Sequence, residues 1–165
     1  MEYANHLNDY AAAPSQQQVA QAVSAAQQAA AENCSTEVYE FCLSAIDLTT
    51  LSCSDSEQSV ADMARRAAEF DLDYPNLRNV ASICVYPPFV ETVGLAIDGT
   101  PLKITAVAGG FPSSQTFLEV KMLEVAMAIE NGADEVDVVL NVGKMLTGAY
   151  DEAANEIEVL LEEAE

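Results

Sequence analysis

Basic residues are scarce in this sequence, and their scarcity excludes whole classes of partner. Lysine and arginine together number 6 against 27 aspartates and glutamates, so the 165-residue chain has a net charge of -21. Nucleic acids and anionic membrane surfaces are contacted mainly through basic side chains, and we therefore exclude both as partners. The excess of carboxylates is typical of a well-solvated surface.

Metal-binding signatures are also missing. The cysteines are Cys34, Cys42, Cys53 and Cys84, no two of which have CxxC spacing, and the single histidine is His6. We therefore expect no zinc site, and free thiols in a reducing compartment.

Long apolar runs are absent as well. No run reaches the roughly 18 residues that cross a bilayer. The first ten residues, MEYANHLNDY, lack the basic and apolar regions of a secretory signal. Half of the residues are nevertheless apolar, which is enough to build the core of one domain. We expect a soluble, cytoplasmic protein.

The residues that are present predict one leading helix and then an alternation of strands and helices. The leading helix covers residues 15–32 and begins with an S-x-x-Q capping box, Ser15 to Gln18. The predicted strands are 41–50, 79–86, 102–108 and 135–141. The predicted helices that follow them are 54–70, 87–97, 116–132 and 149–164.

Helix boundaries are predicted from capping residues. A box from Ser54 to Glu57 opens the second helix, Thr116 with Glu119 opens the fourth, and Gly132 ends it. The predicted buried stripes of three helices are Val60, Met63, Ala64 and Ala67; Leu118, Met122, Val125, Ala126 and Ile129; and Ala153, Ile157, Leu160, Leu161 and Ala164.

The alternation predicts a parallel sheet, either an open doubly wound sheet or part of a (β/α)8 barrel. Side chains alternate across a strand, so each predicted strand has an apolar face suited to helices and a face that carries polar residues. Asp47, Cys84 and Asp137 lie on the polar faces. An open sheet with helices on both sides would bury these aspartates, whereas a barrel directs them into its interior. Parity therefore favours the barrel, with Asp137 as a buried carboxylate.

Length predicts that the barrel is incomplete. A barrel needs eight strand–helix units and about 250 residues, and this sequence supplies four units. The final LLEEAE places glutamates in a last helical turn, where the helix dipole disfavours negative charge. We expect an N-terminal helical extension over 1–36 and the first half of a TIM-barrel domain over 37–165.

Four segments carry a resemblance to a known family. They are AIDLTTLS (45–52), VASICVYPPFV (80–90), GGFPSSQT (109–116) and NGADEVDVVLNVGKMLTGAYD (131–151). In order and spacing they resemble the deoxyribose-phosphate aldolases, and the resemblance covers nearly the whole chain from the first helix onward.

The resemblance implies a class I aldolase on a (β/α)8 barrel. Such enzymes reversibly cleave 2-deoxy-D-ribose 5-phosphate into glyceraldehyde 3-phosphate and acetaldehyde, in deoxyribonucleotide catabolism. A lysine forms a Schiff base with the substrate, and no metal takes part. The implied ligand is a small phosphorylated sugar, and the implied assembly is a homo-oligomer. The open edges of a half-barrel separately predict pairing through those edges.

The resemblance also implies roles for single residues. Asp137 corresponds to the proton-relay acid, and Asp47 to a barrel-lining aspartate that arranges the active-site network. Thr49 and Cys84 correspond to positions near the substrate. Without the family, Asp137 could simply pair with a lysine, Asp47 and Thr49 could be strand-end hydrogen-bonding residues, and Cys84 could be a small core residue. Ser52 departs from the asparagine of many relatives, so its contact is left unassigned.

The Schiff-base lysine of the family is absent from this sequence. It lies in a sixth-strand stretch like FIKTSTG, a second lysine lies on the seventh strand, and the phosphate-binding loops come later still. Of the lysines present, Lys103 starts a predicted strand at the wrong end of the barrel, and Lys121 lies on a helix among glutamates. Lys144 follows the fourth strand on the catalytic side but matches no nucleophile of the family. We expect the chain alone to have no aldolase activity.

Two other functions stay open at this point. The chain could be a non-catalytic half-barrel that assembles with a second chain through its open strand edges. It could also be an open-sheet small-molecule binder, although the sequence contains neither GxGxxG nor a P-loop.

Overall fold

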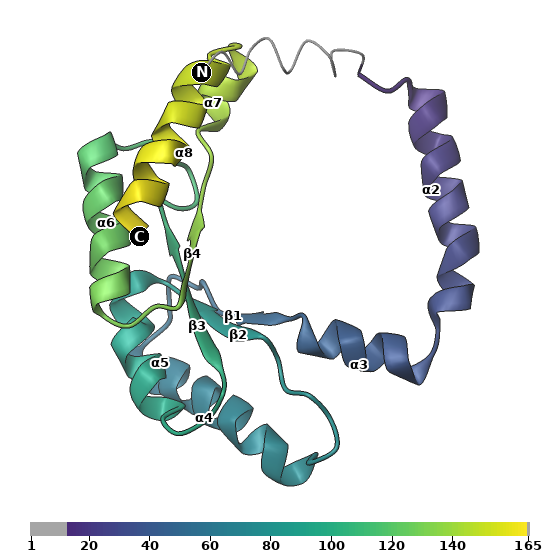
Figure 1. The fold of residues 1–165 in the computed structure, drawn as a ribbon, viewed down its shortest axis with the longest axis vertical. Coiled ribbons are helices and arrows are strands. Elements are labelled where there is room, and N and C mark those ends of the chain that lie inside the picture. The colour runs from purple at the N-terminus through teal and green to yellow at the C-terminus, as the bar shows by residue number, and fades with distance from the viewer. Residues whose placement is uncertain (1–12, 165) are drawn as a thin grey trace.

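A computed structural model describes residues 13–164, and its centre is a four-stranded parallel sheet (Figure 1). The strands are β1 (Asp47–Thr49), β2 (Ser82–Val85), β3 (Lys103–Ala108) and β4 (Glu135–Val138). They lie in chain order, β1-β2-β3-β4, and each neighbouring pair is parallel. A doubly wound sheet reverses its strand order at a switch point, whereas a barrel does not. The predicted partial (β/α)8 barrel is confirmed, and the open doubly wound sheet is not.

Helices cover one face of this sheet. They are α4 (Glu57–Asp73), α5 (Val90–Ala96), α6 (Leu118–Glu130) and α8 (Tyr150–Ala164), with the short connectors η2 (Pro87–Phe89) and α7 (Val142–Leu146). Figure 1 shows α4, α5, α6 and α8 on the same side of the strands. This one-sided arrangement is that of the outer layer of a barrel, and it leaves the other face of the strands without a helical layer.

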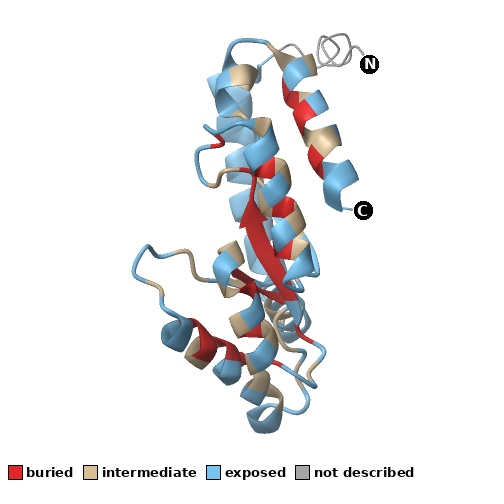
Figure 2. Cartoon of the chain, turned by 90° about the vertical axis from the view of Figure 1, so that its left-hand side faces the viewer, coloured by how far each residue is buried: buried red, intermediate tan, exposed pale blue. Residues whose placement is uncertain are grey.

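The core lies between the strands and these helices, as the buried residues in Figure 2 show. One cluster joins α4 and α5 to β2 and β3 and includes Val60, Ile83, Val93 and Ile104. A second, smaller cluster consists of Ala108, Val125 and Leu160 and joins β3 to α6 and α8. On β2, the core residues Ile83 and Val85 alternate with Ser82 and Cys84, as strand parity predicts.

The N-terminal helices lie apart from this core. They are α2 (Gln16–Ala30), η1 (Ala31–Asn33) and α3 (Thr36–Ser44), and none of their residues is buried. Figure 1 shows α2 well away from the strands. The predicted capping box is confirmed, because the Ser15 hydroxyl accepts from the Gln18 amide and the Gln18 side chain accepts from the Ser15 amide. The division of the chain at residue 36 stays a prediction.

The predicted strand 41–50 is largely wrong. Its first part belongs to α3, which begins after Ser35, whose hydroxyl accepts a hydrogen bond from the Val38 amide. Only Asp47–Thr49 pairs as a strand. A short apolar run fits a strand or a helix equally well, and here the capping serine decides for the helix.

Two predicted helix starts are also wrong. α4 begins after Ser56, not Ser54, and its capping box joins Ser56 to Ser59. α6 begins after Phe117, which caps it without a side-chain hydrogen bond, so Thr116 is no cap. The predicted end of α6 is confirmed, because Gly132 follows the C-cap residue with a φ of 101°.

The C-terminal part adds a helix that the sequence pattern did not predict. α7 begins after Asn141, whose side-chain oxygen accepts from the Lys144 amide. On α8 the predicted inward residues Leu161 and Ala164 are exposed, while Glu156 is buried. His6 lies outside the described residues. Within residues 13–164, no helix has both the length and the apolar character that crossing a bilayer requires.

Candidate functional site

The four site residues expected from the sequence lie on the sheet face that has no helical layer. Register pairs Asp47 with Ser82 and Thr49 with Cys84 across β1 and β2. Asp137 on β4 pairs with Val107 on β3. On each strand these residues alternate with the residues that belong to, or pack against, the core clusters. The predicted polar face is therefore observed.

A chain of hydroxyl groups holds the carboxylate of Asp47. Ser82 Oγ donates to Asp47 Oδ1 at 2.7 Å, and Ser82 Oγ lies 2.7 Å from Thr105 Oγ1. Ser82 and Thr105 are each 1% exposed. Thr49 Oγ1 donates to the Asp47 carbonyl oxygen at 2.8 Å. Asp47 and Thr49 therefore make hydrogen bonds of the kind that the alternative interpretation, strand-end hydrogen bonding, predicts, and a contact of either with substrate stays a prediction.

Cys84 on β2 lies beside Thr49 of β1 in the sheet. Burial raises the pKa of its thiol, a hydrogen bond with the Thr49 side chain lowers it, and the charges of Asp137 and Asp47 raise it further. The pKa therefore lies above its ordinary value. The register places Thr49 beside Cys84, whereas Asp137 lies on the same face two strands away from Cys84.

Cys84 is expected to react with iodoacetamide more than about tenfold more slowly than the other cysteines of the folded chain. It is 3% exposed and its raised pKa keeps it protonated, whereas Cys34, Cys42 and Cys53 are exposed. Timed alkylation at pH 8 with peptide mass spectrometry measures all four in one sample. Equal rates for Cys84 and Cys53 would contradict this environment.

The expectation that Asp137 is buried is wrong for these 165 residues. Along β4, Glu135 and Asp137 are exposed, whereas Val136 and Val138 are half-buried and pack against the smaller core cluster. β4 is the last strand of the described sheet, so only β3 covers one side of it. The carboxylate of Asp137 is therefore open to solvent, or to whatever lies against this face.

The loop after β3 is held tightly beside this face. Gly109 and Gly110 have φ values of 77° and 73°. A Cβ at Gly109 would lie 2.8 Å from Val138 Cγ1, and one at Gly110 would lie 2.8 Å from Thr116 Cγ2. The Gly110 amide also donates to Glu124 Oε2 at 2.8 Å. Only glycine satisfies these positions, which explains the GG of the GGFPSSQT segment.

Sequence reasoning missed a buried ion-pair cluster between α6 and α8. Lys121 is 0% exposed and Glu156 is 7% exposed. Lys121 Nζ donates to Glu156 Oε1 and to Ser114 Oγ. Lys144 Nζ lies 3.4 Å from Glu156 Oε2 and 3.7 Å from Glu152 Oε2. The carboxylate of Glu156 thus accepts hydrogen bonds from two ammonium groups, those of Lys121 and Lys144.

The third lysine is paired as well. Lys103 Nζ lies 2.8 Å from Glu135 Oε1, with both side chains about half exposed. Its pKa is raised, first by the hydrogen bond with Glu135 and then by that group's charge. Every lysine of the sequence is therefore ion-paired with glutamate. A carboxylate partner favours the ammonium form, whereas Schiff-base formation needs the neutral amine.

Glu156 is expected to stabilise the fold less at acidic pH. Burial raises its pKa, but the hydrogen bonds and charges of Lys121 and Lys144 outweigh burial and hold it below the ordinary 4.5. A depressed folded-state pKa gives stability that is present above 4.5 and lost as pH falls through the folded value. Urea midpoints of the parent and of Glu156→Gln should converge below pH 4.5. A constant difference from pH 7 to pH 3 would contradict this.

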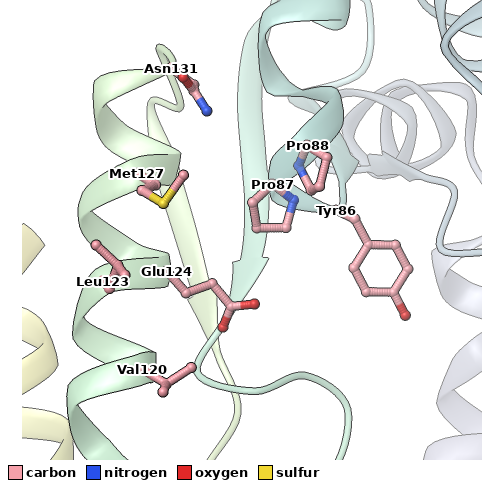
Figure 3. Close-up of a pocket in the computed structure, with 8 residues that line it drawn as sticks. All are labelled: Tyr86, Pro87, Pro88, Val120, Leu123, Glu124, Met127 and Asn131. Carbon is pink, nitrogen blue, oxygen red and sulfur yellow. The ribbon is translucent and has the colours of Figure 1, made fainter.

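A groove of about 540 Å³ lies between η2 and α6 (Figure 3). Its lining includes Tyr86, Pro87, Leu123 and Met127, and it is mostly apolar. Neither Asp47 nor Asp137 lines it, so this groove is separate from the site residues predicted from the sequence. Among residues 13–164, no three histidine, cysteine, aspartate or glutamate side chains are grouped so that they could hold a metal ion.

Comparisons with known proteins agree on one family. No protein-family model matches the chain. The chain is 36% identical over 119 residues to the deoxyribose-phosphate aldolase of Clostridium tetani, covering 72% of this chain and 51% of the relative. It is 35% identical over 122 residues to the human deoxyribose-phosphate aldolase, covering 68% and 38% respectively.

A solved structure shows the same relationship. The tetrameric deoxyribose-phosphate aldolase of Aeropyrum pernix superposes with a TM-score of 0.57 at 28% identity, covering 76% of this chain and 50% of that one. The chain thus spans about half the length, or less, of these relatives.

Proposed function

We propose that this chain, which is related to the deoxyribose-phosphate aldolases by sequence and by fold, supplies the acid–base side chains of a class I aldolase site. The observation that carries the proposal is that Asp47, Cys84 and Asp137 lie on the same face of the sheet, the face without helices. The nucleophilic lysine then comes from a polypeptide segment outside these 165 residues.

The chemistry explains why carboxylates belong on this face. A lysine amine adds to the substrate carbonyl, and the carbinolamine loses water to give an iminium ion. Cleavage of the carbon–carbon bond of 2-deoxy-D-ribose 5-phosphate then releases glyceraldehyde 3-phosphate and leaves an enamine, which is protonated and hydrolysed to acetaldehyde. Asp137, the exposed acid, is proposed to donate and accept these protons, and Asp47, which accepts a hydrogen bond from Ser82, is proposed to orient the network.

The chain by itself is proposed to be inactive. Lys121 is buried against Glu156, Lys144 is held between two glutamates, and Lys103 is paired with Glu135. None presents the unpaired amine that a carbonyl group requires. If the proposal holds, the setting is deoxyribonucleotide breakdown in the cytoplasm.

Complementation tests this proposal. The chain is mixed or co-expressed with the part of the Clostridium tetani aldolase outside the matched region, and release of glyceraldehyde 3-phosphate from the substrate is measured. We expect no cleavage by either part alone and cleavage by the mixture. A complex that forms but leaves the substrate intact would refute the enzymatic function.

One further function is favoured by the sheet edges. Within residues 13–164, β1 and β4 each have a strand neighbour on one side only, which leaves edge hydrogen-bonding groups for another chain. A non-catalytic half-barrel would use these edges for assembly alone. The carboxylates of Asp47 and Asp137 favour a partner that brings cations over a second copy, whose own carboxylates would meet them. Sedimentation of the chain, alone and in the mixture, separates these assemblies.

A further inference from the structure

We infer that Lys121 and Glu156 are positioning residues that fix the loop 109–117 and helix α7. These segments follow β3 and β4. Asp137 lies on β4 and pairs in register with Val107 of β3. In a parallel strand–helix fold, the segments after the strands form the end of the sheet at which ligands bind. The pair would thus hold the rim of the site without touching a ligand.

The loop 109–117 is fastened to α6 at two points. Glu124 Oε2 accepts from the Gly110 amide, and Lys121 Nζ donates to Ser114 Oγ. Lys121 and Glu124 are three residues apart and therefore project from neighbouring positions on one side of the helix. Ser114 is completely buried and has a φ of 57°, a backbone conformation that a serine holds only when its surroundings fix it.

α7 is fastened through the same cluster. Glu156 on α8 accepts from Lys121 with one carboxylate oxygen and from Lys144 of α7 with the other. Residues 109–117, α7 and α8 are thereby linked through one carboxylate, although Ser114 and Glu156 are far apart in sequence. The contact from Lys144 lies at the carboxyl side of β4, where the chain leaves the sheet.

The charges of the pair do more than join α6 to α8. A buried ion pair is often no more stabilising than a well-packed apolar pair of similar volume. Two apolar residues could hold the helices together. They would, however, leave Ser114 Oγ without its donor and Lys144 without Glu156, the more buried of its two carboxylate partners. What the charged pair adds is therefore the orientation of the two segments.

The double variant Lys121→Met/Glu156→Leu separates positioning from stability. We expect it to melt close to the parent, with amides of residues 110–116 and 143–147 exchanging with deuterium at least about tenfold faster. Amides of β2 serve as the internal control. The matched variant Lys103→Met/Glu135→Leu removes an exposed ion pair and should leave both segments unchanged.

Single variants keep the test decisive should the double variant not fold. Ser114→Ala should speed exchange in 110–116 alone, and Lys144→Met in 143–147 alone. Parent-like exchange in both segments, in a folded double variant or in both single variants, would overturn the inference.

Only the statement that these segments form the ligand-binding end of the sheet rests on the proposed function. The exchange measurement needs no substrate, so failed complementation with accelerated exchange would reject the function and keep the positioning role.

Discussion

Asp137→Asn is expected to lower kcat of the complemented enzyme by about 10²–10⁴-fold, the usual worth of a general acid–base group. Asparagine preserves the shape of the side chain but cannot donate and accept the protons of the carbinolamine and enamine steps. KM should change little, because the proton relay acts in the transition state rather than in substrate binding. Steady-state kinetics of substrate cleavage provide both values.

The chain offers a matched control for this variant. Glu135 lies two residues earlier on the same strand and the same face, is also exposed, and pairs with Lys103. Glu135→Gln should leave kcat unchanged. If Asp137→Asn keeps kcat within about twofold of the parent, Asp137 is not the relay acid.

Glu156→Leu is expected to lower the free energy of unfolding by about 3–5 kcal/mol, because it leaves the Lys121 ammonium buried without a carboxylate. Lys121→Met should cost less, because Glu156 keeps Lys144 at 3.4 Å. The double variant Lys121→Met/Glu156→Leu should lie near the parent, since no unpaired charge remains in it. Urea denaturation at pH 7 measures all three.

The exposed ion pair sets the baseline for these stabilities. Glu135→Leu breaks the contact with Lys103, in which both side chains are about half exposed, and should change the unfolding free energy by less than about 1 kcal/mol. A Glu156→Leu variant as stable as Glu135→Leu would show that the buried cluster contributes nothing.

Strand parity is the part of the site that the sequence predicts best. Alternation across a strand depends only on local backbone geometry, so Asp47, Cys84 and Asp137 could be assigned to one face without knowledge of tertiary contacts. Whether that face is covered depends on neighbouring strands. Parity alone could therefore not predict that Asp137 is exposed. Asp137 is exposed because, within the described residues, no further strand pairs with the outer edge of β4.

The ion-pair cluster was missed because lysine and glutamate are ordinarily surface residues. A signal was nevertheless present in the sequence. Lys121 lies between Leu118 and Val125 at helical spacing, and Glu156 lies between Ala153 and Leu160 in the same way. A single charge inside each of two apolar stripes, of opposite sign, indicates a buried pair between the helices.

Borohydride trapping tests the central claim most directly, namely that the chain carries the acids of an aldolase site but not its nucleophile. The chain is incubated with 2-deoxy-D-ribose 5-phosphate, reduced, and analysed by intact and peptide mass spectrometry. We expect no adduct on the chain alone, and an adduct on a lysine of the added segment in the complemented enzyme. An adduct on Lys121 or Lys144 of the chain alone would contradict the account, because this half-barrel would then carry its own nucleophile.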